Sequence, residues 1–234
     1  MKSVAIMQPY FLPYIGYFQL INSVDEFVIY DNIQYTKKGW INRNRILVNG
    51  SEKLITLPIA KDSDYLNVND RVLADSWNNE KIKMLNLIKG SYKKAPHYHA
   101  AFPIIRSVIE LPHTSLFEFI IGGLRLLNSY LGIDTKITIS SHIKIDPTLK
   151  GKNKVIAICK HLNTDIYINP VGGQLLYNYD DFKHEGLDLK FIKSQNFNYK
   201  QYKNEFIPWL SILDVLMFNE RKDIIDYLDR YTLI

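Results

Sequence analysis

Short apolar runs near the start of the chain have the length and the bounding residues of buried strands. The run 4–7 ends at Gln8-Pro9, and the run 26–30 ends at Asp31. Between them, four apolar residues after Pro13 recur at helical spacing and predict a helix: Tyr14, Tyr17, Phe18 and Ile21. Strand, helix and strand in this order predict a βαβ unit, whose right-handed crossover places two parallel strands side by side.

The middle of the chain is predicted to be a hairpin followed by helices. Two β-like runs, 44–48 and 53–58, flank Asn49-Gly50, a pair that strongly favours a two-residue hairpin turn. Apolar residues at helical spacing then predict helices over 77–88, 103–109 and 114–131, and Gly132 is a typical C-terminal helix cap. We therefore expect a helical insertion at about 78–131.

The last hundred residues return to alternating strands and helices. Their pattern predicts strands over 136–139, 165–168 and 188–192, a helix over 153–162, and two closing helices over 208–219 and 221–228. The sequence thus predicts one α/β domain over 1–234. Its sheet is expected to be open, mostly parallel and of Rossmann-like type.

Composition narrows the class of protein. The chain has 234 residues, of which 47% are hydrophobic and 23% charged, and its net charge is +5. This hydrophobic content excludes a disordered chain, and the scattered lysines favour solvated loops over a nucleic-acid-binding stripe. No apolar run reaches the ~20 residues of a membrane span, and no targeting segment is apparent, so we expect a cytoplasmic protein. The single cysteine, Cys159, lies on an apolar helical stripe, which favours a packed, inert thiol.

The densest group of polar and aromatic residues lies between Gln8 and Arg45, after the first two predicted strands. Ligands of open α/β sheets bind at the carboxyl ends of the strands, so these residues are expected to meet in one water-excluding hollow. Aromatic rings there can stack on a base or a sugar, and cations can hold phosphates. The alternative is that the tyrosines are core residues and that the cations belong to a solvated hairpin. The binding candidates are Tyr10, Tyr14, Tyr17, Gln34, Tyr35, Lys38, Trp40 and Arg43.

Within that group, Tyr14-Ile15-Gly16-Tyr17 stands where nucleotidyltransferases carry two histidines flanking a glycine. In those enzymes the imidazoles and the helix N-terminus stabilise the charge of a triphosphate. A neutral phenol donates a hydrogen bond but offers no cation. The likeness therefore favours the fold more than the reaction.

Further candidates follow later strands. Gly172-Gly173 lets backbone amides approach a ligand, although the pattern slightly favours an ordinary turn into the next helix. His142 is a possible base after the run 136–139, and a structural histidine is the alternative. Ser211 and Asp214 share a helix face, either to bind substrate or to cap the helix and pair with an arginine such as Arg43 or Arg45. No metal site is expected, because the His97 and His99 pair lacks a third ligand.

Two long strings, 7–18 and 31–45, carry a resemblance to a known family, and the string 211–219 supports it. The sequence resembles the WbqC-like proteins over nearly its whole length. This resemblance implies a role in the biosynthesis of bacterial O-antigen (lipopolysaccharide) or another surface polysaccharide, because genes of the family typically lie among genes for that pathway. Some of these polysaccharides carry 4-amino-4,6-dideoxyhexoses acylated by an amino acid, and the resemblance makes the chain a candidate for that step.

We therefore expect an acyl- or aminoacyltransferase that uses an activated donor and acts on the amine of a nucleotide-linked amino sugar. Such a reaction needs a base for the ammonium and donors for an oxyanion. Asp31 is the predicted base, with His142 as the second choice, and Gln8 and Asn42 are the predicted donors. Two alternatives stay open: a non-catalytic nucleotide-sugar binder or scaffold of the same pathway, and an adenylylating enzyme of the nucleotidyltransferase type. No residue pattern points to a particular cofactor or oligomeric state.

Overall fold

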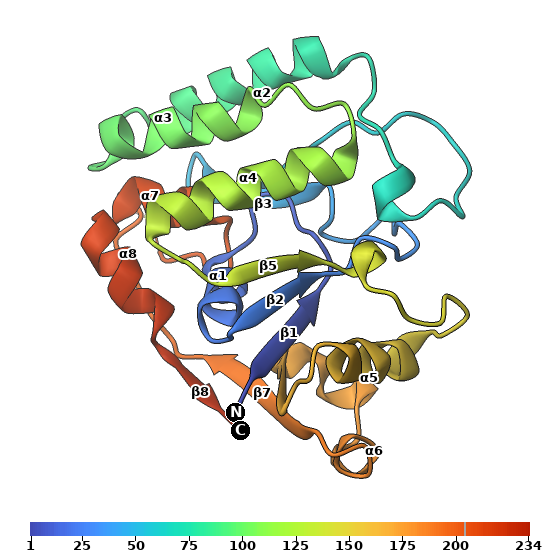
Figure 1. Cartoon of the computed structure of the whole chain (residues 1–234). Coiled ribbons are helices and arrows are strands. Elements are labelled where there is room, and N and C mark those ends of the chain that lie inside the picture. Colours follow the sequence, from blue (N-terminus) through green and yellow to red (C-terminus); the bar gives the residue numbers. More distant parts are fainter. Residues whose placement is uncertain (204) are drawn as a thin grey trace.

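A six-stranded sheet forms the centre of the protein (Figure 1). The computed structural model describes residues 1–203 and 205–234. The strand order is β5 (Lys136–Ile139), β2 (Glu26–Ile29), β1 (Ser3–Met7), β6 (Ile166–Pro170), β7 (Asp188–Ser194) and β8 (Tyr231–Leu233). Each neighbouring pair from β5 to β7 is parallel, and β8 alone pairs antiparallel with β7. The predicted fold class, an open and mostly parallel sheet of Rossmann-like type, is confirmed.

Helices cover both faces of this sheet. On one face lie α1 (Ile15–Asn22), α4 (Leu116–Leu131), α7 (Ile212–Phe218) and α8 (Arg221–Leu228). The other face carries α5 (Gly151–His161) and α6 (Tyr179–Lys183). Outside α4, two further helices, α2 (Trp77–Tyr92) and α3 (Tyr98–Ile109), stack as an extra layer in the upper part of Figure 1.

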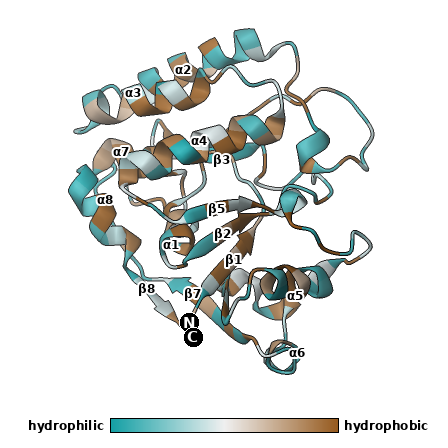
Figure 2. Cartoon of the chain, viewed as in Figure 1, coloured by the Kyte–Doolittle hydropathy of each residue, from teal (hydrophilic) through white to brown (hydrophobic). Residues whose placement is uncertain are grey.

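Alternation along the strands explains how the sheet serves two cores. In β1, Ala5 packs with the α1–α4 side, whereas Val4 and Ile6 pack with Val155 and Ile158 of α5. Successive side chains of a strand point to opposite faces, so a strand covered on both sides reads as a continuous apolar run. The brown colour of β1 in Figure 2 reflects this double burial.

Local turn chemistry sets several boundaries. The hairpin of β3 (Arg43–Val48) and β4 (Ser51–Thr56) turns at Asn49 and Gly50, whose φ angles are 51° and 78°. Positive φ at both residues is what a type I′ hairpin turn requires, so this prediction is confirmed. Gly132, with φ 75°, caps α4 in the left-handed region as the sequence indicated.

Other boundaries differ from the predictions. The closing helix predicted from residue 208 begins only at Ile212, because Trp209 has φ 61° and the Ser211 Oγ caps the helix by accepting from Leu213 N at 3.2 Å. The short elements α6 and β8 were not predicted, nor were the 3₁₀ turns η1 (Val68–Asp70), η2 (Ser140–His142) and η3 (Val171–Leu176). Within the described residues, no helix combines the length and the apolar character needed to cross a membrane.

Candidate functional site

The order of the strands reverses at β1. The chain builds the sheet outward through β2 and β5 on one side, and through β6 and β7 on the other. In open α/β sheets, ligands bind outside the carboxyl ends of the strands at such a switch point. Met7 pairs with Ile29 and Ala5 pairs with Ile168, so the segments after β1, β2 and β6 leave the sheet side by side. The predicted residues on these three segments are Gln8, Tyr10, Asp31, Gly172 and Gly173.

Asp31 ties three parts of this edge together. Its side chain is buried, and Oδ1 accepts hydrogen bonds from the Ser140 Oγ and the Ser141 backbone N–H, both at 2.9 Å. The other oxygen, Oδ2, accepts from the Asn69 Nδ2 at 3.0 Å. Asp31 therefore links the ends of β2 and β5 to η1. A carboxylate engaged in this way suits a positioning role better than proton abstraction.

His142 and Gln8 lie at the same edge with more freedom. His142 ends η2, directly after the two serines that Asp31 holds, and its side chain is exposed. Gln8 follows β1 and is half-buried, and its backbone carbonyl accepts from the Tyr17 hydroxyl at 2.8 Å. Gln8 thus lies at the switch point, whereas His142 follows the edge strand β5, two strands away from β1.

The two tyrosines of the nucleotidyltransferase-like string have different surroundings. Tyr17 is 2% exposed, and burial raises its pKa well above the ordinary value, with the neighbouring Tyr10 phenol adding to the effect. The ring of Tyr10 lies 5.6 Å from that of Tyr17. With its hydroxyl committed to Gln8, Tyr17 is a core residue rather than a phosphate donor. Tyr14 is half-buried at the start of α1.

Helix α5 brings to the edge a lysine that the sequence reasoning did not single out. Lys154 is 7% exposed, and its Nζ donates to the side-chain oxygen and the carbonyl of Asn32 at 3.0 and 3.3 Å. It also lies 4.7 Å from the centroid of the Tyr30 ring. Burial lowers the pKa of Lys154, and the nearby Asp31 opposes that effect. Within the described chain, no carboxylate forms an ion pair with Lys154.

The sequence pattern of α5 contains a signal for the burial of Lys154. It stands four residues before Ile158, on the stripe of α5 that faces the sheet. Its neighbour Lys152, by contrast, is exposed and pairs with Asp181 at 2.5 Å. The sequence predicts solvated loops for the scattered lysines, and this prediction is wrong for Lys154, which is buried.

The glycine pair after β6 serves two purposes. Gly173 is buried, and a Cβ added there would lie 2.0 Å from the Nδ2 of Asn169, itself 6% exposed. The backbone at this position therefore has to be glycine for the amide of Asn169 to lie against it. Gly172 is exposed, with no atom within 4 Å of an added Cβ. Its backbone is open to a ligand.

The basic and aromatic residues between 34 and 45 are distributed over several places. Arg43 donates to the carbonyl oxygens of Gly39, at 3.0 Å, and of Lys38, so it closes its own loop. Trp40 is 40% exposed and lies beneath the guanidinium groups of Arg43 and Arg45, at 5.9 and 5.3 Å from its ring centroid. Lys38 is exposed.

The remaining residues of that stretch lie against segment 57–71. The amide of Gln34 donates to the Asp64 carbonyl at 3.1 Å, and the guanidinium of Arg71 lies 5.0 Å from the Tyr35 ring centroid. Asn42 is buried and donates to the Leu57 carbonyl at 2.8 Å. The structure thus places these residues in several surroundings rather than around one shared hollow.

The predicted pairing of Asp214 with an arginine is wrong. Asp214 is fully buried, and it accepts hydrogen bonds of 2.7 Å from the Tyr92 hydroxyl, the Tyr199 hydroxyl and the Gln201 amide. Burial raises its pKa, and these three donors oppose that effect. Ser211 caps α7, as one of its two interpretations held, and its hydroxyl also donates to the Leu12 carbonyl at 2.7 Å. Asp214 thus joins α2, α7 and the segment after β7.

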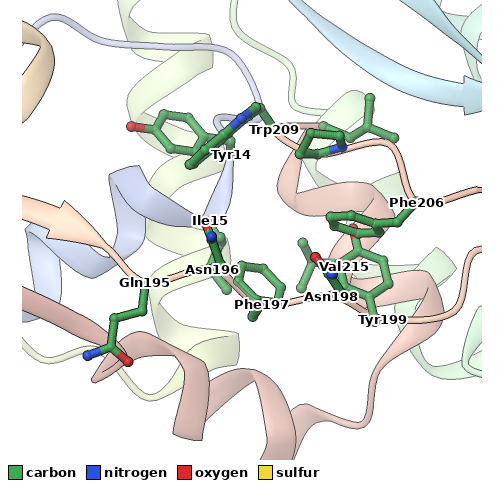
Figure 3. A pocket seen from close by; sticks show the side chains of 12 residues that line it. Tyr14, Ile15, Gln195, Asn196, Phe197, Asn198, Tyr199, Phe206, Trp209 and Val215 are labelled. Atoms are coloured by element: carbon green, nitrogen blue, oxygen red, sulfur yellow. The ribbon is translucent and has the colours of Figure 1, made fainter.

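A separate pocket lies where the start of α1 meets the segments after β7 and before α7 (Figure 3). Its empty space, open mouth included, is about 440 Å³. Tyr14 is the one residue of the predicted set that lines it. The rest of its lining comes from the segments 195–199 and 206–210, together with Ile15 and Val215.

The strand order defines the class: an α/β protein with an open, mostly parallel sheet of Rossmann-like type. The model of the WbqC-like protein family matches residues 8–226, and the chain belongs to that family. It is also 32% identical over 234 residues to an uncharacterized protein, Rv1507c, of Mycobacterium tuberculosis (strain ATCC 25618 / H37Rv). That similarity covers 97% of this chain and 98% of the relative.

Proposed function

We propose that this protein transfers an acyl or aminoacyl group to the amine of a nucleotide-linked sugar during the biosynthesis of a bacterial surface polysaccharide. The observation that carries the proposal is the strand order β5-β2-β1-β6-β7, because it gathers the segments after β1, β2 and β6 at one switch point. Sheets of this order bind nucleotides there. Membership of the WbqC-like family supports the assignment to this pathway.

The diphosphate of the nucleotide is assigned to the β2–β6 side of this edge. Lys154 supplies a buried cation that forms no ion pair within the described chain. The exposed backbone at Gly172 allows close approach of phosphate oxygens, since no side chain covers it. Tyr10, half-buried after β1, is assigned to the base or ribose ring.

The chemistry requires two proton transfers and one acyl transfer. The sugar ammonium loses one proton to a base, and its nitrogen attacks the carbonyl carbon of an activated acyl donor. The bond to the donor's leaving group then breaks, and the second proton lost by the nitrogen passes to that leaving group. His142 is the proposed base, because its side chain is exposed at the carboxyl edge and histidine is the side chain that most often serves as a general base. Asp31 accepts hydrogen bonds from Ser140 and Ser141 and so positions the segment that carries His142. Gln8 is the proposed donor to the developing oxyanion.

The direct test is incubation of the protein with dTDP-4-amino-4,6-dideoxyglucose and separate acyl-coenzyme A and aminoacyl donors, with mass spectrometry of the sugar product. His142→Ala is expected to lower turnover by at least about 100-fold, the usual contribution of a general base. His184→Ala is the matched control, since His184 is exposed beside α6 and away from the carboxyl edge. Equal turnover of the two variants would refute the role of His142.

A non-catalytic nucleotide-sugar binder or scaffold is the second candidate function. It is favoured by the observation that Asp31, Asn42 and Arg43, all predicted to contact substrate, are engaged in hydrogen bonds within the protein. Thermal shifts with UDP-, GDP- and dTDP-sugars, compared with ATP and coenzyme A, separate the candidates. Binding of a nucleotide sugar without turnover under any donor supports the binder, whereas a shift with ATP alone supports an adenylylating enzyme.

A further inference from the structure

Aromatic side chains form facing walls of the pocket beside α1. Figure 3 shows Tyr14 and Trp209 along one side, and Phe197, Tyr199 and Phe206 around the other. Tyr14 and Trp209 meet edge to face, with their ring centroids 5.8 Å apart. Trp209 is 53% exposed although it is among the largest apolar side chains of the protein. Its indole therefore stays accessible at the pocket mouth.

The wall opposite Trp209 is held rigidly. Phe197 stacks between Tyr199 and Tyr227, with centroid distances of 5.7 and 4.7 Å. Phe206 packs edge to face against Tyr199 at 5.0 Å. The hydroxyl of Tyr199 is fixed by its hydrogen bond to the buried Asp214. This wall is consequently preorganised, which lowers the entropy lost when a ligand binds.

The other wall depends on unusual backbone conformations. Leu12 and Trp209 have φ angles of 44° and 61°, in the left-handed region that bulky residues rarely adopt. Hydrogen bonds from Ser211 Oγ to the Leu12 carbonyl and from Ile212 N to the Pro13 carbonyl hold the two segments together. Backbone strain that the surroundings enforce clusters at functional sites. Here it places the rings of Tyr14 and Trp209 at one mouth.

Glycine is required at position 16 for the same arrangement. A Cβ added to Gly16 would lie 2.3 Å from Cε2 of the Tyr14 ring and 2.9 Å from the Ser194 Oγ. The Tyr14 ring therefore lies directly over the first turn of α1. The Gly16 of the nucleotidyltransferase-like string is explained by this contact.

The lining chemistry selects the kind of ligand. None of the lining residues that the structure describes is charged, and polar groups come from the exposed amides of Asn196 and Asn198. An amide offers both donors and acceptors, which hydroxyl groups need, and aromatic faces pack against the C–H face of a pyranose. A phosphate, by contrast, finds no cation here. Gln195 points away from the hollow in Figure 3.

We propose that this pocket binds the pyranose ring of the substrate, with the ring packed between Trp209 and Phe197 and its hydroxyls bonded to Asn196 and Asn198. This inference rests on the nucleotide-sugar binding of the proposed function and not on its base. The pocket follows β7, whereas His142 follows β5, four strands away in the sheet, so the two assignments compete for the sugar and the experiments decide between them. The segment 8–14 joins the two regions, because it carries Gln8 at the switch point and Tyr14 at the pocket. Six residues span at most about 22 Å, so one elongated ligand can reach both.

Saturation-transfer NMR on the full chain tests the assignment with dTDP-4-amino-4,6-dideoxyglucose, dTDP, and the methyl glycosides methyl β-D-glucopyranoside and methyl α-L-rhamnopyranoside. In the unaltered protein, saturation is expected to reach the ring protons of the sugar. Trp209→Ala is expected to weaken binding of the nucleotide sugar by about tenfold and to leave the affinity for dTDP unchanged. Asn198→Ala, at an exposed position, is expected to weaken it by about threefold. Tyr65→Ala, at an 85% exposed tyrosine outside the pocket, is the control.

The outcomes separate this inference from the proposed function. Saturation of the thymidine alone, with no effect of Trp209→Ala or Asn198→Ala, overturns the pyranose pocket and leaves nucleotide binding in place. Absence of any nucleotide signal, with methyl glycoside signals that Trp209→Ala abolishes, refutes the proposed function and upholds the pocket. Absence of signals from every probe refutes both. Thermal unfolding of each variant shows that the fold is retained.

Discussion

The two edges of one sheet bury opposite charges in different ways. At the amino edge, Glu26 is 1% exposed and pairs with the Nζ of Lys2 at 2.7 Å and of Lys136 at 2.9 Å. At the carboxyl edge, Lys154 is 7% exposed, its Nζ donates to the side-chain and carbonyl oxygens of Asn32, and it lies over the face of the Tyr30 ring. The buried Glu26 forms two ion pairs, whereas Lys154 forms none among the described residues, and the nearby Asp31 is engaged in hydrogen bonds with other groups.

The difference distinguishes a structural charge from one available for binding. Burial by itself raises the pKa of Glu26, but hydrogen bonds from Lys2, Thr138 and Lys136 outweigh it and lower the pKa to about 2. The pKa of Lys154 is lowered by burial. A buried charge without a counter-ion is unfavourable until a ligand neutralises it. We therefore expect Glu26 to serve stability and Lys154 to serve binding.

The largest expected effect is on stability at the amino edge. A pKa lowered from 4.5 to about 2 corresponds to about 3 kcal/mol of stability near neutral pH, and Glu26→Gln is expected to lose that much. The unfolded chain takes up this proton first as the pH falls, so the contribution is present above about pH 4.5 and is lost towards pH 2. Urea unfolding at several pH values measures it.

Glu52→Gln supplies the control for that experiment. Glu52 also pairs with a basic side chain, Arg45, but half of its side chain is exposed, so we expect a change below about 1 kcal/mol. Equal losses in the two variants, or a stability of Glu26→Gln that still falls between pH 4.5 and 2 as steeply as that of the unaltered protein, would contradict the structural role of Glu26.

The next effect concerns how tightly the carboxyl edge is packed. Gly173→Ala would drive a methyl group into the buried Asn169 amide, and we expect a loss of about 2 kcal/mol in stability together with weaker nucleotide binding. The adjacent Gly172→Ala meets open space and lies at no left-handed φ, so its stability should stay within about 0.5 kcal/mol. Chemical unfolding of both variants decides whether the β6 turn is as constrained as the geometry indicates.

Much of this fold is predictable from short segments. Strands buried on both faces read as apolar runs, and the predicted strand 26–30 corresponds to β2 (Glu26–Ile29), which is buried throughout. The hairpin follows from the turn chemistry of Asn49-Gly50. β8 (Tyr231–Leu233) was not predicted, because it is a three-residue edge strand that is mostly exposed and has no apolar alternation. The short elements lacked a pattern long enough to be recognised.

The candidate site is less predictable, because it depends on distant pairings. Gln8 and Asp31 could be placed at the sheet edge, since each directly follows a strand. The burial of Lys154 depends on which face of α5 meets the sheet. The hydrogen bond between Tyr92 and Asp214 joins residues 122 positions apart, and no local pattern indicates it. The contact between the rings of Tyr14 and Trp209 likewise joins residues that are distant in the sequence.

At the carboxyl edge, the comparison predicts that Lys154 contributes to affinity and not to stability. Lys154→Met is expected to weaken binding of dTDP about tenfold, while the free energy of unfolding stays the same or rises by up to about 1 kcal/mol. Lys152→Met is a closely matched control. It removes the same charge two residues before Lys154, at a position where the lysine is exposed and paired with Asp181. Isothermal titration and urea unfolding measure the two quantities. A marked loss of stability in Lys154→Met with unchanged affinity would make both edges structural.

The smallest effect is expected from Asp31→Asn, and it separates a positioning role from catalysis. The new side-chain oxygen can still accept from Ser140 and Ser141. Its amide can donate to Asn69 once the Asn69 amide rotates, because the Oδ1 of Asn69 is buried and has no partner among the described residues. We therefore expect a stability change below about 1 kcal/mol and nucleotide-sugar turnover within about threefold of the unaltered protein. Asp31→Ala, which removes all three acceptor contacts, should destabilise the edge by more. A loss of turnover of about 100-fold or more in Asp31→Asn, with the fold intact, would instead identify Asp31 as the base.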